Sequence, residues 1–265
     1  MYKAKKYFGQ NFLTDPKIAD KIAETSGADR DCGVIEIGAG RGILTAALAR
    51  CAAKVISLEI DRELLPELVE NLKEYDNIEI INADARKADY AALCALFKTG
   101  EKSLRLILCA NLPYNITTPL LAAILEADCF ERVTVMIQRE VAQRLCAEAG
   151  TPDYGAFSLF VQNRAEVKTA FTVPPGCFTP APKVTSAVVT LERIPMRCTH
   201  PMFERVVRAA FAQRRKQLVN ALSAGLSLNR SAITEVLTSA GIDPQARGET
   251  LTLEDFARIC EGLEK

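Results

Sequence analysis

With 265 residues, of which 49% are hydrophobic and 25% charged, the chain can form one large globular domain, alone or with a small appendage. It has no run of about 18 apolar residues, and its lysine-rich N-terminus lacks the apolar run of a secretory signal. We therefore expect neither export nor a membrane partner. The formal net charge of zero argues weakly against a nucleic-acid partner.

Cysteine and histidine usage argues against a metal site. The nine cysteines are scattered, without a C-x-x-C pair, and the single histidine is His200. This pattern is typical of reduced thiols in a cytoplasmic protein and does not suit zinc. We therefore expect a cytoplasmic location and no bound metal.

Strands and helices alternate over the first part of the chain. A helix is predicted to begin at Asp15-Pro16, where an N-cap precedes proline at the first helical position. Apolar runs predict strands at 33–37, 54–58, 78–81, 104–109 and 133–137. Helical spacing predicts helices after them, at about 43–50, 60–73 and 87–97, from 117 onward, and at 139–149. Such alternation is typical of a parallel sheet covered by helices on both faces.

The pattern changes after these elements. Residues 157–161 are interpreted as a helix, because a helix continues the alternation. Residues 167–173 and 185–191 have strand character. The connection between them, 174–182, is too short for a helical crossover, so the last two strands should be antiparallel.

The C-terminal part of the chain is predicted to be entirely helical. Four segments have helical spacing, at 201–213, 216–225, 230–240 and 252–262. We therefore predict a large domain of residues 1–195 and a small all-α domain of residues 196–265.

Basic residues are distributed unevenly. Residues 1–17 carry a net charge of +3, and residues 201–230 carry +5. The second run includes the consecutive basic residues Arg214, Arg215 and Lys216. A local basic face can bind phosphates in a protein that is neutral overall, although two solvated charge runs would give the same pattern.

One strand ends abruptly in Asn111-Leu-Pro-Tyr114. Pro113 cannot continue a strand, because it lacks an N–H and its φ is fixed. It also favours an extended Leu112, so the four residues should form a stiff turn. In parallel sheets ligands bind at the carboxyl ends of the strands. The Asn111 amide, the Leu112 carbonyl and the Tyr114 ring would there suit a planar nitrogen base.

A second turn, Gly38-Ala-Gly40-Arg-Gly42, lies between a strand and a helix. Missing side chains let a ligand approach the backbone, although such a turn can also serve only tight packing. The dinucleotide fingerprint would place its third glycine at Ile43, so this spacing disfavours NAD.

Acidic side chains end the next two predicted strands. Glu59 can accept hydrogen bonds from both hydroxyls of a ribose, and Asp84 can accept one from an adenine amino group. The alternative for each is an exposed acid at a strand end. Together with the glycine turn, they predict a pocket for an adenosine without polyphosphate, because no Walker lysine is present.

These motifs carry a family resemblance. The segments Glu36-Ile-Gly-Ala-Gly-Arg-Gly42, Glu59, Asp84 and Asn111-Leu-Pro-Tyr114 resemble S-adenosylmethionine-dependent adenine-N6 methyltransferases. Three further matches narrow the resemblance to small-subunit ribosomal RNA adenine dimethyltransferases of the bacterial methyltransferase A type. They are Gly9-Gln-Asn-Phe-Leu13, Phe178-Thr-Pro-Ala-Pro-Lys-Val-Thr-Ser186 and Phe211-Ala-Gln-Arg-Arg-Lys216.

The resemblance implies a class I methyltransferase (Rossmann-like) α/β fold. Its sheet would have seven mostly parallel strands with an antiparallel last strand. The cofactor would be S-adenosyl-L-methionine. The cofactor-binding residues carried over from the family are Asn11 and Leu13 as a cover, Gly38 and Gly40 in the glycine turn, Glu59 at the ribose, Asp84 at the adenine, and Asn111 beside the methyl donor.

The resemblance also implies the reaction and its RNA. Two methyl groups would be placed on each of two adjacent adenosines near the 3′ end of 16S rRNA, within the 30S subunit or its precursor, with a role in ribosome biogenesis. The implied catalytic residues are Asn111, Leu112, Pro113, Tyr114 and Phe178, the last two stacking on the base. Arg214, Arg215 and Lys216 would bind RNA, and a monomer is expected.

Two alternatives remain open. One is large-subunit rRNA adenine dimethylation of the antibiotic-resistance kind. The other is a ribosome-assembly binding factor without catalysis. The Phe178 segment and the basic run at Arg214 favour the small-subunit type, and the intact Glu59, Asp84 and Asn111 argue against lost activity.

Overall fold

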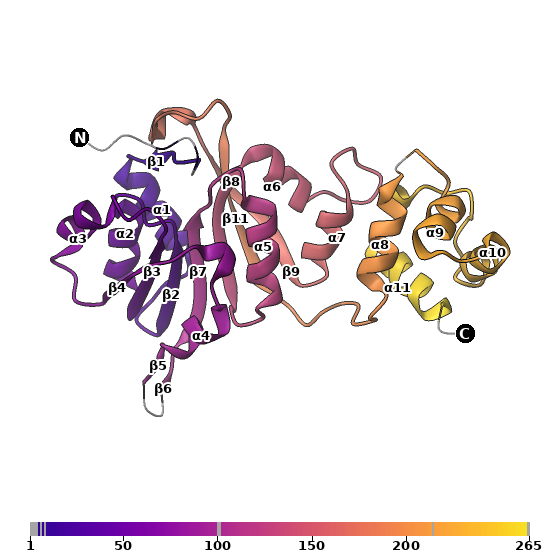
Figure 1. Cartoon of the computed structure of the whole chain (residues 1–265), viewed down its shortest axis with the longest axis horizontal. Helices are drawn as coiled ribbons and strands as arrows, with labels where there is room; N and C mark the ends of the chain where they lie inside the picture. Colours follow the sequence, from indigo (N-terminus) through magenta and orange to yellow (C-terminus); the bar gives the residue numbers. More distant parts are fainter. Residues whose placement is uncertain (1–4, 6, 8, 100–101, 214, 264–265) are drawn as a thin grey trace. The chain divides into compact units, whose positions relative to one another are not determined.

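The computed structural model, which describes residues 5, 7, 9–99, 102–213 and 215–263, contains a seven-stranded sheet in the order β4-β3-β2-β7-β8-β11-β9 (Figure 1). The strands from β4 to β8 pair in parallel, and β11 pairs with β8 in antiparallel orientation. The predicted mixed sheet is therefore confirmed. Its strands are β2 (Cys32–Ile37), β3 (Lys54–Glu59), β4 (Ile78–Asn82), β7 (Arg105–Asn111), β8 (Arg132–Gln138), β9 (Ala165–Val173) and β11 (Ser186–Arg193).

The central strands are buried on both faces, which explains their nearly continuous apolar sequences. Every residue of β2 is buried. Val34 of β2 and its register partner Ile107 of β7 belong to the cluster that α1 (Pro16–Ser26) and α2 (Ile43–Cys51) complete on one face. Because parallel crossovers are right-handed, α5 (Thr117–Glu126), which joins β7 to β8 in the opposite direction, covers the other face.

The other helices of the alternating region are α3 (Leu65–Leu72), α4 (Tyr90–Ala95) and α6 (Arg139–Leu145). The predicted helix 87–97 is shorter in the structure, because the Asp89 side chain accepts a hydrogen bond from the Ala92 N–H and caps α4 at its start. A 3-10 turn at Ala85–Lys87 precedes it. The short antiparallel strands β5 (Lys98–Thr99) and β6 (Lys102–Ser103) have no counterpart in the sequence prediction.

The strand order determines where along the sheet a ligand is expected to bind. From β2 the chain proceeds outward to β3 and β4, and it then returns to the other side of β2 with β7. The carboxyl ends of β2 and β7 therefore meet at the point where the strand order reverses. Ligands of open α/β sheets bind at such a switch point.

A two-stranded ribbon brings the N-terminal segment to the Phe178 segment. In it β1 (Phe12–Leu13) pairs antiparallel with β10 (Phe178–Thr179), and Leu13 lies opposite Phe178. The Thr14 N–H extends the ribbon by donating to the Cys177 carbonyl at 2.9 Å. The 3-10 turn Pro175–Cys177 leads into β10. Because Leu13 and Phe178 join the α1/α2 core cluster, the ribbon is anchored to the core.

The chain divides into two compact units, residues 1–142 with 166–193 and residues 143–165 with 194–265. The division at 193 lies near the predicted boundary, but residues 143–165 pack with the second unit. That unit contains α7 (Ala156–Gln162), α8 (Phe203–Ala212), α9 (Leu218–Leu226), α10 (Arg230–Ser239), the 3-10 turn Gly248–Thr250 and α11 (Leu253–Gly262). Its core is a cluster around Leu218, Leu222 and Phe256. Across the described residues, the helices are too short or too polar to cross a membrane.

Candidate active site

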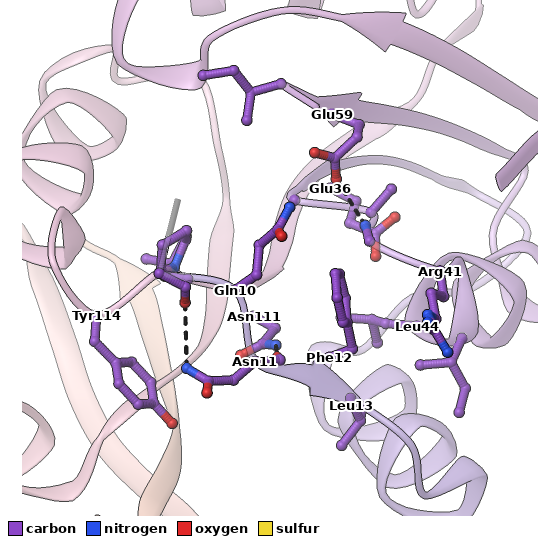
Figure 2. A pocket seen from close by; sticks show the side chains of 18 residues that line it. Gln10, Asn11, Phe12, Leu13, Glu36, Arg41, Leu44, Glu59, Asn111 and Tyr114 are labelled. Carbon is purple, nitrogen blue, oxygen red and sulfur yellow. Dashed lines mark hydrogen bonds between the residues drawn. The ribbon is translucent and has the colours of Figure 1, made fainter. Parts of the chain in front are cut away.

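An open cleft of about 730 Å³ lies at the carboxyl ends of β2, β3 and β7 (Figure 2). Three segments line it, the N-terminal Gly9–Leu13, the glycine turn and the turn after β7, and the side chains of Glu36 and Glu59 complete it. Most of the predicted site residues therefore meet here. They are Asn11, Leu13, Gly38, Gly40, Glu59, Asn111, Leu112, Pro113 and Tyr114.

The glycine turn is shaped by backbone that other residues rarely adopt. Gly38 and Gly40 have φ angles of 77° and 57°, in the left-handed region. The Gly38 N–H donates to the Leu58 carbonyl of β3 at 2.8 Å. A Cβ at Gly40 would lie 3.0 Å from the Phe12 ring. Glycine is therefore required for Phe12 of the N-terminal segment to approach the turn.

Glu59 is buried and hydrogen-bonded, with 4% of its surface exposed. It accepts hydrogen bonds from the Gly40 N–H at 2.9 Å and the Asp61 N–H at 2.8 Å, one on each carboxylate oxygen. Burial raises its pKa, and the two N–H groups oppose that shift. Because each carboxylate oxygen has two lone pairs, each can still accept a hydrogen bond from a ligand hydroxyl.

Asp84 lies in a second hollow of about 720 Å³, which shares Gly38, Ile60 and Pro113 with the cleft. Its carboxylate is bound by the Arg86 guanidinium, with Nε 2.9 Å from Oδ1 and Nη2 2.6 Å from Oδ2. These hydrogen bonds hold the pKa of Asp84 below its usual value. A ligand at Asp84 must therefore share the carboxylate with Arg86 or displace it.

The Asn111 side chain is oriented by the N-terminal segment. Its Nδ2 donates to the Asn11 main-chain carbonyl at 3.1 Å, so the amide nitrogen faces Asn11. The Leu112 N–H donates to the Met136 carbonyl at 3.1 Å and fixes the start of the turn. Among the residues that the structure describes, Asn111 Oδ1 and the Leu112 carbonyl accept no hydrogen bond. Because both residues line the cleft, the two acceptors are available to a ligand that enters it.

The rest of this turn is held on both sides of Tyr114. The Pro113 carbonyl accepts hydrogen bonds from the Ile116 N–H at 3.2 Å and from the Thr117 hydroxyl at 3.0 Å. The Tyr114 hydroxyl lies 2.6 Å from Ser186 Oγ, at the start of β11. Burial raises the pKa of the half-buried Tyr114. The ring is therefore fixed at the edge of the cleft.

A family model described as Ribosomal RNA adenine dimethylase matches residues 1–265. The chain belongs to this family. A Ribosomal RNA small subunit methyltransferase A from Lactiplantibacillus plantarum is 44% identical, with 99% of this chain and 91% of the relative covered. A relative of the same name from Caldanaerobacter subterraneus subsp. tengcongensis is 41% identical, with 98% and 97% covered.

Two solved structures share the fold of this rRNA adenine dimethylase. The 23S rRNA methyltransferase ErmE has a TM-score of 0.72 at 29% identity, with 96% of this chain and all of that chain covered. A dimethyladenosine transferase from Plasmodium falciparum has a TM-score of 0.77 at 25% identity, with 94% and 95% covered. The class I methyltransferase fold that the sequence predicts is therefore confirmed.

The family uses S-adenosylmethionine, and the residues of the dimethylase fit that cofactor. The cleft holds Glu59 besides the deeply buried Glu36, the adjoining hollow holds Asp84, and the two join at Gly38. An elongated nucleoside can therefore extend from one into the other. Neither acid requires a metal, and the described part of the chain contains no group of three or more metal-ligating side chains.

Phe178 is the predicted catalytic residue that the structure does not bring into the cleft of the dimethylase. Its ring is buried, with 4% exposed, and it belongs to the same core cluster as Leu13. It is not among the residues that line the cleft. We expected the Phe178 ring to stack on the target base. It lies elsewhere because the pairing of β10 with β1 turns Phe178 toward the core.

Two charged residues of the cleft were not predicted as site residues. Glu36 is 1% exposed, and its Oε2 accepts hydrogen bonds from the Thr45 and Ser57 hydroxyls, both at 2.6 Å. Burial raises its pKa to about 7. Arg41 lies in the glycine turn and lines the cleft. Two features of the sequence could have identified them: Glu36 is an acid within an apolar strand, and Arg41 is a basic residue between two glycines.

The basic run of the dimethylase lies in the second unit. Arg215 and Lys216 are exposed in the segment between α8 and α9. The Lys216 N–H donates to the Gln213 carbonyl at 2.8 Å. In the part of the chain that the structure describes, neither side chain forms an ion pair. Arg214 lies outside the described residues.

Proposed function

We propose that this dimethylase transfers two methyl groups to the N6 amino group of each of two adjacent adenosines near the 3′ end of 16S rRNA, in the 30S subunit or its precursor. The observation that carries the proposal is the pair of available acceptors, Asn111 Oδ1 and the Leu112 carbonyl, beside the cleft that contains Glu59. Relatives named for the small subunit, at 44% and 41% identity, support the choice of RNA.

The cofactor would extend across both hollows. Glu59 would accept hydrogen bonds from the ribose hydroxyls, and Asp84 would accept one from the adenine amino group. Gly38 and Gly40 would let the backbone contact the cofactor. Asn11 and Leu13, held by Asn111 and by the ribbon with β10, would cover it. When bound, S-adenosylmethionine supplies an electrophilic methyl group on a sulfonium sulfur.

The turn after β7 would prepare the target amine. An adenine amino group is a poor nucleophile, because its lone pair is delocalised into the ring. Asn111 Oδ1 and the Leu112 carbonyl would accept its two N–H bonds and favour a pyramidal nitrogen with its lone pair directed at the methyl group. That lone pair would form the new N–C bond as the methyl–sulfur bond breaks and its electron pair stays on the sulfur, which becomes a neutral thioether. The acidic ammonium product would then lose its proton to water. No strong general base is required, and alignment supplies most of the acceleration.

Tyr114 would hold the flipped base. An adenosine in RNA must leave its stack to reach the cleft, which costs a few kcal/mol. Stacking on an aromatic ring returns about 1–3 kcal/mol per base. The hydrogen bond to Ser186 fixes the Tyr114 ring before the base arrives. Phe178 would act from the core, by supporting Leu13.

The predicted domain of residues 196–265, which makes up most of the second unit, would bind RNA through Arg214, Arg215 and Lys216. Exposed arginine and lysine side chains neutralise phosphates and release counterions. Residues 1–195 would form the catalytic domain. We expect the protein to act as a monomer in the cytoplasm, where 30S subunits assemble.

Methylation of ribosomal particles tests the proposal. Purified protein and labelled cofactor are incubated with 30S and 50S particles from a strain that lacks these methyl groups. We expect label in 16S rRNA only. The 29% identity to ErmE makes large-subunit methylation the main alternative, and label confined to 23S rRNA would establish it.

A pure assembly factor is the remaining alternative. Titration of the protein with S-adenosylmethionine distinguishes it, because a factor without catalysis has no need of the cofactor. We expect saturable binding that Glu59→Gln weakens. Absence of detectable binding would favour the assembly factor.

A further inference from the structure

Arg41 is the cationic side chain of the cleft. Among the described lining residues it is the only one with a positive charge, whereas Glu36 and Glu59 are acidic. Figure 2 shows it beside Leu44 and across the Phe12 ring from Asn111. A cation in a cleft that otherwise contains acids indicates that the ligand has a negative group at this end.

The structure holds Arg41 in place while leaving donors free. The Arg41 carbonyl accepts a hydrogen bond from Asn71 Nδ2 at 3.0 Å, and the guanidinium carbon lies 5.4 Å from the centroid of the Phe12 ring. Its Nε is 3.3 Å from Glu67 Oε1, but that nitrogen is buried and makes no hydrogen bond within the described ranges. The guanidinium is therefore positioned by stacking and by a partly exposed ion pair, with hydrogen-bonding capacity to spare.

The position of Arg41 along the cleft identifies the ligand group. Gly38, Ile60 and Pro113 belong to both hollows, so they mark the end where the adenosine would enter the Asp84 hollow. Arg41, Ile43 and Leu44 line only the cleft. Beyond its ribose and sulfur, S-adenosylmethionine has an amino acid group whose carboxylate is its one anionic group.

We propose that Arg41 binds the α-carboxylate of the methionine part of S-adenosylmethionine. The inference rests on the proposed use of this cofactor in the cleft. The planar guanidinium matches a carboxylate in a two-point hydrogen-bonded pair, which a lysine cannot reproduce. The Phe12 ring, held by the ribbon with β10, orients the guanidinium. Glu67 balances its charge before the ligand binds.

Two ligands separate this role from a merely structural one. S-Adenosylhomocysteine contains the amino acid group, and 5′-methylthioadenosine lacks it, while both contain the adenosine. Isothermal titration measures Kd for each ligand with the wild-type protein and with Arg41→Gln. We expect Arg41→Gln to weaken S-adenosylhomocysteine by about 10- to 100-fold, as for a hydrogen bond to a charged group, and to leave 5′-methylthioadenosine within about twofold.

Two further variants complete the test. Arg41→Lys keeps the charge and much of the packing, so it should fold and bind S-adenosylhomocysteine with intermediate affinity. Glu67→Gln removes the ion-pair partner and should leave that affinity unchanged or tighter. Equal weakening of both ligands by Arg41→Gln, or no weakening of either, would overturn the role of Arg41. A wild-type protein that binds neither ligand would refute the cofactor site itself, and with it this inference.

Discussion

The side-chain amide of Asn111 donates a 3.1 Å hydrogen bond to the main-chain carbonyl of Asn11, a residue 100 positions earlier in the chain. The bond fixes which end of the amide faces the N-terminal segment. Because the nitrogen faces Asn11, the oxygen remains available as an acceptor. The same contact holds the segment that covers the cofactor cleft. One side chain thus connects the proposed cofactor cover to the proposed amine site.

Replacement of Asn111 tests its role as the acceptor. We expect Asn111→Ala to lower the rate of methyl transfer by about 100-fold or more, because one of two acceptors for the target amine is lost. Cofactor affinity should fall only modestly, since Glu59 and the glycine turn are intact and the hydrogen bond to the Asn11 carbonyl is the one contact with the cofactor cover that is lost. Single-turnover kinetics and cofactor titration measure the two effects separately.

Asn111→Asp is the matched variant. It retains an oxygen acceptor and loses the donor to the Asn11 carbonyl. We expect it to keep more activity than Asn111→Ala and to bind the cofactor less tightly than the wild-type protein. Turnover of Asn111→Ala at the wild-type rate would refute the role of the side chain.

Substitution by leucine should mainly affect stability at Phe178 and mainly affect RNA binding at Tyr114. Phe178 is buried in the core cluster, so Phe178→Leu should lower the free energy of unfolding by about 1–3 kcal/mol and leave the KM for RNA near the wild-type value. Tyr114 lies at the cleft, so Tyr114→Leu should raise that KM by about 5- to 100-fold through lost stacking. Urea unfolding measures the free energy of unfolding of each variant, and steady-state kinetics measures its KM for RNA. A raised KM with unchanged stability for Phe178→Leu would instead place its ring on the base.

Glu36 should make folding stability depend on pH. Burial raises the pKa of its carboxyl from an ordinary value of 4.5 to about 7, and the nearby Glu59 adds to the shift. The folded state therefore favours the neutral acid. The stability that the neutral Glu36 contributes to the folded state is fully present below about pH 4.5, and it is lost as the pH rises through about 7. Glu36→Gln, which keeps an acceptor for Thr45 and Ser57, should gain stability relative to the wild-type protein over this range, by roughly 3 kcal/mol.

Urea unfolding of both proteins at pH 5 and pH 8 measures this difference. Other groups with shifted pKa values, such as Glu59, titrate in both proteins and cancel to first order. Stability curves that remain parallel between the two pH values would show that Glu36 does not titrate differently on folding.

Removal of the basic run should weaken RNA binding in a salt-dependent way. Replacement of Arg214, Arg215 and Lys216 by alanine should reduce the slope of log K against log salt by up to about one for each lost phosphate contact. Lys73→Ala is a control, because Lys73 is an exposed lysine of the first unit in an ion pair with Glu70. An unaltered slope in the triple variant would mean that these side chains are merely solvated.

The local parts of the fold and site were predictable, because each has a signal within a few residues. The apolar strand before Gly38 ends in glycines, and the strand before Asn111 ends in proline. Both turns lie where the sequence places them. The switch point follows from the order of the strands, which the alternation of elements only implies.

The contacts that complete the site were not predictable in the same way. The ribbon of Phe12–Leu13 with Phe178–Thr179 has two residues in each strand, too few for any periodicity. The strand-end position of Asp84 was evident, but not that Arg86 would bind its carboxylate. Residues 143–165 show helical character, yet only tertiary packing decides that they join the second unit.

Mass mapping of methylated adenosines is the most direct test of the central claim. Purified protein, with Asn111→Ala as the blank, is incubated with S-adenosylmethionine and with 30S particles from a strain that lacks these methyl groups. We predict two adjacent N6,N6-dimethyladenosines near the 3′ end of 16S rRNA with the wild-type protein and none with the blank. Methylation confined to 23S rRNA in parallel 50S reactions, or no methylation of either RNA, would contradict the account.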